Sequence, residues 1–103
     1  MGRAYGKLVR DNIPAIIEAG GEKPLTRTLN DAEYLQALIA KLQEETAEFE
    51  ADHSVEELAD IKEVVIAIRE AIGVHAGDLE DVRRTKARNN GRYKQRIYLE
   101  GVA

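Results

Sequence analysis

The sequence contains no cysteine among its 103 residues, so disulfides and zinc–thiolate sites are excluded. It also has no apolar run long enough to cross a bilayer, and its start, MGRAYGKLVRDNIP, does not resemble a signal peptide. We therefore expect a cytoplasmic protein with one domain over residues 1–103. A chain of this length buries only a modest core, so association with another copy would help its stability.

Several catalytic arrangements are missing as well. There is no Ser–His–Asp combination and no glycine-rich phosphate loop, since Gly20–Gly21 is typical of a helix end. Glu50-x-x-His53 is a single copy of a motif that a di-iron bundle needs on two helices, and we expect His75 to lie in a loop. These absences leave carboxylates and basic side chains as the candidates for chemistry.

Charge is unevenly distributed along the chain. Residues 31–81 are dominated by acids, whereas the stretch RRTKARNNGRYKQR at 83–96 holds bases and no acid. A basic strip beside an acidic body could bind nucleic acid, or a small anion held between metal and strip, or it could simply neutralise the acidic body. Repulsion between the acids and a polyanion makes the nucleic-acid interpretation the weakest of the three.

Helix signals dominate the sequence. The signals predict an all-α bundle of about four helices, built on an antiparallel two-helix hairpin and followed by a short extended C-terminal segment. The predicted helices are 13–19 after Asp11 or Asn12, a long helix after Asn30 with Glu33 in a capping box, a third from Ser54 to Gly73, and a fourth capped by Asp78 and ending at Gly91. The end, YKQRIYLEGV, is β-prone and predicts either a short strand or an extended arm.

Four acids fall on or beside the faces that the two long helices should bury. Rotating by about 100° per residue places Glu45 at the edge of one apolar stripe and Glu57 inside the other. The turn near Asp52–His53 is equidistant from Glu48 and Glu57, and also from Glu45 and Asp60, so the hairpin would bring these four acids level with one another. Glu57 is also placed to complete a capping box with Ser54.

A buried carboxylate is costly without a partner, and a cation is the usual remedy. The candidate ligands are Glu45, Glu48, Glu57 and Asp60. An all-oxygen set favours Mg²⁺, with Mn²⁺ possible, and such a site suits hydrolysis of a phosphoanhydride. The competing interpretation is an acidic surface exposed to solvent.

The segment EETAE…ELAD resembles the E-E-x-x-E…E-x-x-D signature of the MazG-like, all-α nucleoside triphosphate pyrophosphohydrolases. The match is closer to a branch similar to phosphoribosyl-ATP pyrophosphohydrolase, through YGKLVRDNIPAII, LNDAEYLQALIAKLQEE and RTKARNNGRYKQRIYLE. The resemblance covers nearly the whole chain, and its combination of three segments is more specific than the central motif alone.

This resemblance implies a Mg²⁺-dependent hydrolase that converts a nucleoside triphosphate to a monophosphate and pyrophosphate, assembled as a homodimer or homotetramer. It implies that Glu45, Glu48, Glu57 and Asp60 hold the metal and that Glu44 and Glu45 act in catalysis. It also implies substrate-phosphate contacts from basic residues of the end segments, namely Lys7, Arg10, Lys86, Arg88 and Arg96. We expect no membrane partner, and a helical module that binds nucleotide or nucleic acid without hydrolysis is the alternative.

Two features depart from the family pattern. Only eight residues separate Glu48 from Glu57, which is short for the wider family and could change pocket depth. Arg92 stands where close relatives tend to have a second glycine, and adds charge near the expected substrate end. Neither departure removes a candidate ligand.

Overall fold

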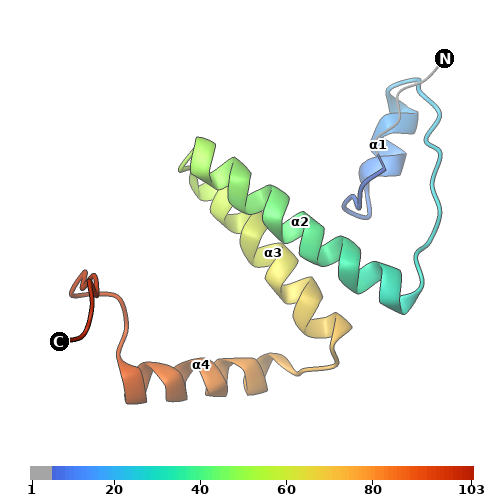
Figure 1. Ribbon diagram of the computed structural model, residues 1–103. Helices are drawn as coiled ribbons and strands as arrows, with labels where there is room; N and C mark the ends of the chain where they lie inside the picture. The colour runs from blue at the N-terminus through green and yellow to red at the C-terminus, as the bar shows by residue number, and fades with distance from the viewer. Residues whose placement is uncertain (1–5) are drawn as a thin grey trace.

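The computed structural model describes residues 6–103, and this part of the chain is all-helical (Figure 1). The helices are α1 (Ile13–Ala19), α2 (Asp31–Ala51), α3 (Val55–Ala71) and α4 (Ala76–Asn90). The predicted all-α class is therefore confirmed. The described residues contain no strand, so the β-prone end beyond Gly91 is an extended arm rather than part of a sheet.

Local capping explains where the two long helices begin. The Asn30 side chain accepts a hydrogen bond from the Glu33 backbone N–H at 2.9 Å, and the Asn30 N–H donates to the Glu33 carboxylate at 3.3 Å. This is the predicted capping box, which satisfies two backbone donors that the helix itself leaves free. At α3 the Ser54 hydroxyl accepts from the Glu57 N–H at 3.2 Å.

The start of α4 differs from the expected one. We predicted Asp78 as its cap, but the helix begins at Ala76 after His75, whose backbone is extended. The His75 carbonyl accepts hydrogen bonds from the N–H groups of Asp78 and Leu79, so the first turn forms without a side-chain cap. Asp78 instead lies in that first turn, where a carboxylate is favoured by the helix dipole.

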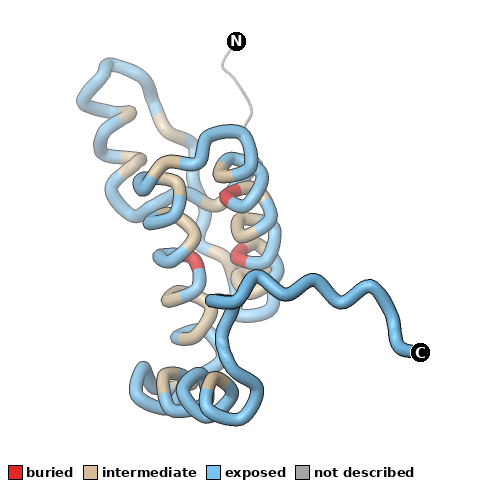
Figure 2. Tube along the Cα trace, turned by 90° about the vertical axis from the view of Figure 1, so that its left-hand side faces the viewer, coloured by how far each residue is buried: buried red, intermediate tan, exposed pale blue. Residues whose placement is uncertain are grey.

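The long helices α2 and α3 pack along each other, and α3 also touches α4. Figure 1 shows α3 running back beside α2, with α4 extending away from the far end of α3 and α1 off to the side of the pair. Among the described residues, only Leu38 and Val64 are buried hydrophobic side chains, one on each of the packed helices. Figure 2 shows how few segments of the chain are buried. The α2–α3 pair is therefore the core, and it also positions the candidate site.

No helix in residues 6–103 has both the length and the apolar character needed to cross a membrane.

Candidate metal centre

Three of the four predicted ligands meet between α2 and α3. One carboxylate oxygen from each of Glu45, Glu57 and Asp60 lies within 4.8 Å of the others. Glu45 comes from α2, and the other two come from the first half of α3. Residues far apart in sequence thus share one small volume because the two helices pack along each other.

Burial distinguishes this cluster from an ordinary acidic surface. Glu45 is only 7% exposed and is the buried charged residue of the described chain. The Oε2 atoms of Glu45 and Glu57 are both buried and have no hydrogen-bond partner. Because a buried carboxylate oxygen without a partner is costly, these two atoms indicate that the site is suited to a cation.

The same crowding changes the acidity of the cluster. Burial raises the pKa of Glu45 above its ordinary value, and contact with Glu48 and the charges of Glu48 and Asp60 raise it further, while Lys41 opposes the shift. Desolvation also raises the pKa of Glu57, followed by the effects of Glu48, Asp60 and Glu45. Ionising all of these carboxyl groups together is therefore unfavourable unless a positive charge is added.

Glu48, the fourth predicted ligand, is exposed and stands outside the group of three. It is nevertheless close enough to Glu45 and Glu57 to raise the pKa of both. Its place is at the solvent edge of the cluster. The role of Glu48 as a metal ligand stays a prediction.

Lys41 lies directly beside the cluster, and sequence reasoning did not identify it as a site residue. Its Nζ is 3.6 Å from Glu45 Oε1 and 3.3 Å from Glu44 Oε1, and its side chain is largely buried. The signal that could have identified it is the spacing from Lys41 to Glu44 and Glu45, three and four residues along one helix. Lys41 offsets part of the acidic charge from within α2.

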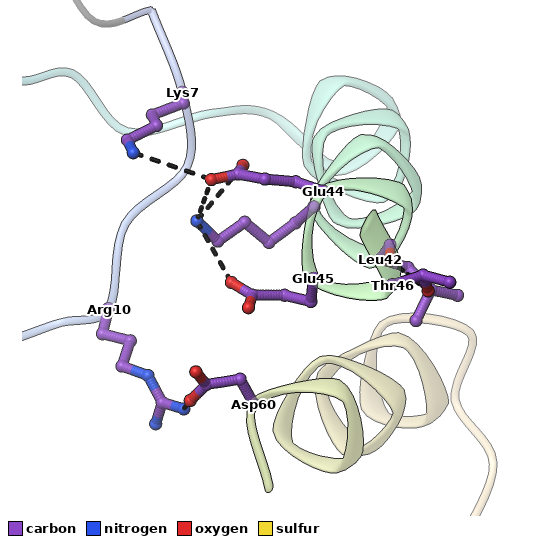
Figure 3. A network of polar contacts seen from close by, with 8 residues as sticks. Lys7, Arg10, Leu42, Glu44, Glu45, Thr46 and Asp60 are labelled. Carbon is purple, nitrogen blue, oxygen red and sulfur yellow. Dashed lines mark hydrogen bonds and ion pairs between the residues drawn. The ribbon is translucent and has the colours of Figure 1, made fainter. Parts of the chain in front are cut away.

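The segment before α1 supplies two more cations, as Figure 3 shows. Arg10 Nη2 donates to Asp60 Oδ1 at 2.6 Å, which joins residues fifty positions apart. Lys7 Nζ lies 3.6 Å from Glu44 Oε1. Glu44 itself is thus held between Lys7 and Lys41, next to the group of three rather than in it. The N-terminal part of the predicted substrate-binding set therefore does lie over the acids.

The C-terminal members of the predicted substrate-binding set, Lys86, Arg88 and Arg96, lie away from the acidic cluster within one chain. Lys86 and Arg88 belong to α4, which leaves the end of α3 far from the cluster, and Arg96 follows in the exposed arm (Figure 1). Within residues 6–103, α4 packs only on α3. Arg88 Nη2 reaches Thr85 of its own helix at 3.4 Å. A substrate role for these three residues stays a prediction.

The donor set fits a hard divalent cation. All candidate ligand atoms are carboxylate oxygens, which Mg²⁺ and Mn²⁺ prefer. The histidine closest in sequence, His53, lies instead against the Phe49 ring, with centroids 5.4 Å apart. A di-iron site of the Glu-x-x-His type therefore gains no support from the placement of His53.

Comparison with known proteins gives one partial match and no function. An uncharacterised protein of Mycolicibacterium smegmatis is 58% identical over 45 residues, which covers 44% of this chain and 46% of that protein. The match thus spans less than half the length of the relative. No family model matches the chain, and no solved structure matches it.

Proposed function

We propose that this protein is a Mg²⁺-dependent nucleoside triphosphate pyrophosphohydrolase, which cleaves between the α- and β-phosphates to release a monophosphate and pyrophosphate. The observation that carries the metal site is the pair of buried, unpartnered oxygens on Glu45 and Glu57. The reaction class comes from the resemblance of EETAE…ELAD to MazG-like enzymes.

Glu45, Glu57 and Asp60 would hold the ion, and Glu48 stands at the edge where it could complete the set. A bound Mg²⁺ supplies charge neutralisation at phosphate oxygens and a lowered pKa for water. Glu44 lies beside the ligands in contact with two lysines, and is the candidate to orient the attacking water.

The basic residues over the cluster are suited to the phosphates of the substrate. Arg10 and Lys7 extend toward the acids from a segment outside the α2–α3 pair. A cation that stabilises the charge growing on phosphate oxygens in the transition state contributes directly to rate. The side chains of Lys7 and Arg10 are 46% and 58% exposed, so they can change partner without unfolding a helix.

The test is an assay of pyrophosphate release with a panel of nucleotides and Mg²⁺, including phosphoribosyl-ATP, dNTPs and damaged nucleotides. We expect Asp60→Asn and Glu57→Gln to lower both Mg²⁺ affinity and turnover by at least ~10-fold, as loss of metal-site groups does. Glu63→Gln is the matched control, because Glu63 is an exposed acid of the same helix.

Two outcomes would contradict the proposal. One is normal pyrophosphate release by Asp60→Asn and Glu57→Gln. The other is tight binding of a Mg²⁺–nucleotide complex with no pyrophosphate released from any member of the panel, which would indicate a binding module. Binding to polynucleotide that survives EDTA and weakens with salt would instead indicate a nucleic-acid module.

A further inference from the structure

The two oxygens of the Glu45 carboxylate have different surroundings at the centre of the acidic cluster. Glu45 Oε1 lies 3.6 Å from Lys41 Nζ, whereas Glu45 Oε2 is buried and has no hydrogen-bond partner. Glu57 Oε2 is likewise buried without a hydrogen-bond partner. Glu45 therefore has an ammonium group at one oxygen and no donor at the other, which is the oxygen suited to a metal ion.

The Lys41 ammonium group occupies a position with the features of a second cation site. Its Nζ lies 3.3 Å and 3.4 Å from the two carboxylate oxygens of Glu44, in addition to its contact with Glu45 Oε1. The two acids follow Lys41 by three and four residues on α2, a spacing that places all three on one side of the helix. Figure 3 shows the carboxylates of Glu44 and Glu45 directed to the same side of α2. Three carboxylate oxygens from two acids thus lie around one ammonium group.

Lys41 is held more firmly than the other two cations at the site. Its side chain is 18% exposed, against 46% for Lys7 and 58% for Arg10. Lys7 and Arg10 also reach the acids from the segment before α1, whereas Lys41 belongs to the same helix as Glu44 and Glu45. A metal ion can replace an exposed partner with little rearrangement, but the helix keeps Lys41 beside the carboxylates that it contacts.

We propose that the Lys41 ammonium stands where a two-metal centre would have its second ion, so that the site takes one divalent cation per chain. In two-metal sites the ions lie about 3.5–4 Å apart and act together on the reacting oxygens. Here the Glu45 carboxylate would link one metal ion to the ammonium group instead. This position belongs to the metal site of the proposed function, on which the inference rests. Lys41 is then a positioning residue, because it acts by holding Glu44 and Glu45.

The charges gathered at the site agree with a single divalent ion. The carboxylates are those of Glu44, Glu45, Glu48, Glu57 and Asp60, and the cations in contact with them are Lys7, Arg10 and Lys41. Counted as ionised, five negative and three positive groups leave a formal charge of −2, which one divalent ion neutralises. A second divalent ion would leave an excess of positive charge in a partly buried site unless it displaced one of the cations.

The test counts the Mn²⁺ ions bound by the full chain without nucleotide, from the loss of the free-ion signal in electron paramagnetic resonance. We expect one ion per chain for wild type. Lys41→Met removes the ammonium group at similar side-chain length, which frees Glu44 and one oxygen of Glu45, so we expect two ions per chain. Two ions that share the Glu45 carboxylate should also show magnetic coupling in the bound spectrum, a signature that a purely structural role of Lys41 would not produce.

Two variants are matched to Lys41→Met. Lys41→Arg keeps the positive charge and should therefore keep one ion per chain. Lys62→Met makes the same exchange at an exposed lysine of α3 and should also keep one. Circular dichroism establishes whether each variant remains helical, and the wild-type count decides alone if Lys41→Met does not.

The outcomes separate this inference from the proposed function. Two Mn²⁺ ions per wild-type chain, or a single ion in a helical Lys41→Met variant, would overturn the role of Lys41 even if the protein releases pyrophosphate. An absence of Mn²⁺ binding would overturn both the role of Lys41 and the metal site. One ion in wild type and two in Lys41→Met, with no pyrophosphate released from any nucleotide, would support the role of Lys41 and contradict the proposed reaction.

Discussion

Arg10 illustrates at the scale of one residue how the acidic cluster is balanced. Its guanidinium binds Asp60 at 2.6 Å, so it occupies a carboxylate that the proposed metal also needs. Lys41 plays a similar part at Glu45, but from within the same helix. The two cations therefore compete with a metal ion to different degrees, since Arg10 is far more exposed than Lys41.

We predict that Arg10→Ala tightens Mg²⁺ binding in the absence of nucleotide, because a competing cation is removed. An exposed ion pair is worth at most about 1 kcal/mol, so the expected gain is up to about fivefold. Titration calorimetry with Mg²⁺ or Mn²⁺ measures it. Arg27→Ala is the control, since Arg27 pairs with Glu33 away from the cluster. Unchanged or weaker binding in Arg10→Ala would contradict the competition.

Glu45 makes stability depend on pH. Burial raises its pKa in the folded state above the ordinary value of 4.5, so the folded protein binds this proton more readily than the unfolded chain. The free energy of unfolding therefore falls as pH rises from 4.5 through the raised pKa. Above that pKa the loss of stability caused by ionising Glu45 in the folded state is complete.

We predict that Glu45→Gln stabilises the metal-free protein at pH 7 by about 1 kcal/mol, an effect of ordinary size for a point mutation. The gain should shrink as pH falls toward 4.5. Thermal unfolding in EDTA across this pH range measures the difference, with Glu63→Gln as the control. A stability gain in Glu45→Gln that grows toward acid pH would contradict this direction of the pH dependence.

At the scale of elements, the helix starts depend on short-range hydrogen bonds. The side chain of Asn30 caps α2, whereas Asn12, at the equivalent position of α1, makes no side-chain cap bond. This is why the start of α2 was predictable from a few neighbouring residues. The start of α4 was not, because its first turn relies on backbone groups and the extended conformation of His75.

The two asparagines form a matched pair for experiment. We predict that Asn30→Ala lowers the free energy of unfolding by about 1 kcal/mol, because the Glu33 backbone N–H loses its side-chain acceptor. Asn12→Ala should change it by less than about 0.5 kcal/mol. Urea denaturation of both variants measures the difference. Equal losses would mean that the capping box at α2 contributes nothing specific.

For the whole molecule, the proposed metal site would couple metal binding to folding through the α2–α3 pair. The proposed ligands come from both helices, so the unfolded chain does not hold them together. A cation that binds only the folded state stabilises it by mass action. Its effect should therefore extend to the entire folded chain and not only to the site.

We predict that Mg²⁺ stabilises folded wild type by about 2.7 kcal/mol when the ion is present at a hundred times its dissociation constant. The melting temperature of wild type should rise accordingly. Asp60→Asn should lose most of this increase, and Glu63→Gln should keep it. Thermal unfolding with and without EDTA is the measurement. An equal increase in Asp60→Asn would assign the stabilisation to another part of the molecule.

The sequence by itself determined the helical class, most helix limits and the acids that face between the two long helices. These follow from neighbours within about one helical turn, through apolar spacing and capping. Only the tertiary structure decided that Glu45, Glu57 and Asp60 meet while Glu48 stays at the edge, and that Arg10 binds Asp60 across fifty residues. It also decided that Val55, Leu58 and Val65 of α3 stay exposed. These outcomes depend on how the helices rotate and pack, which local spacing does not determine.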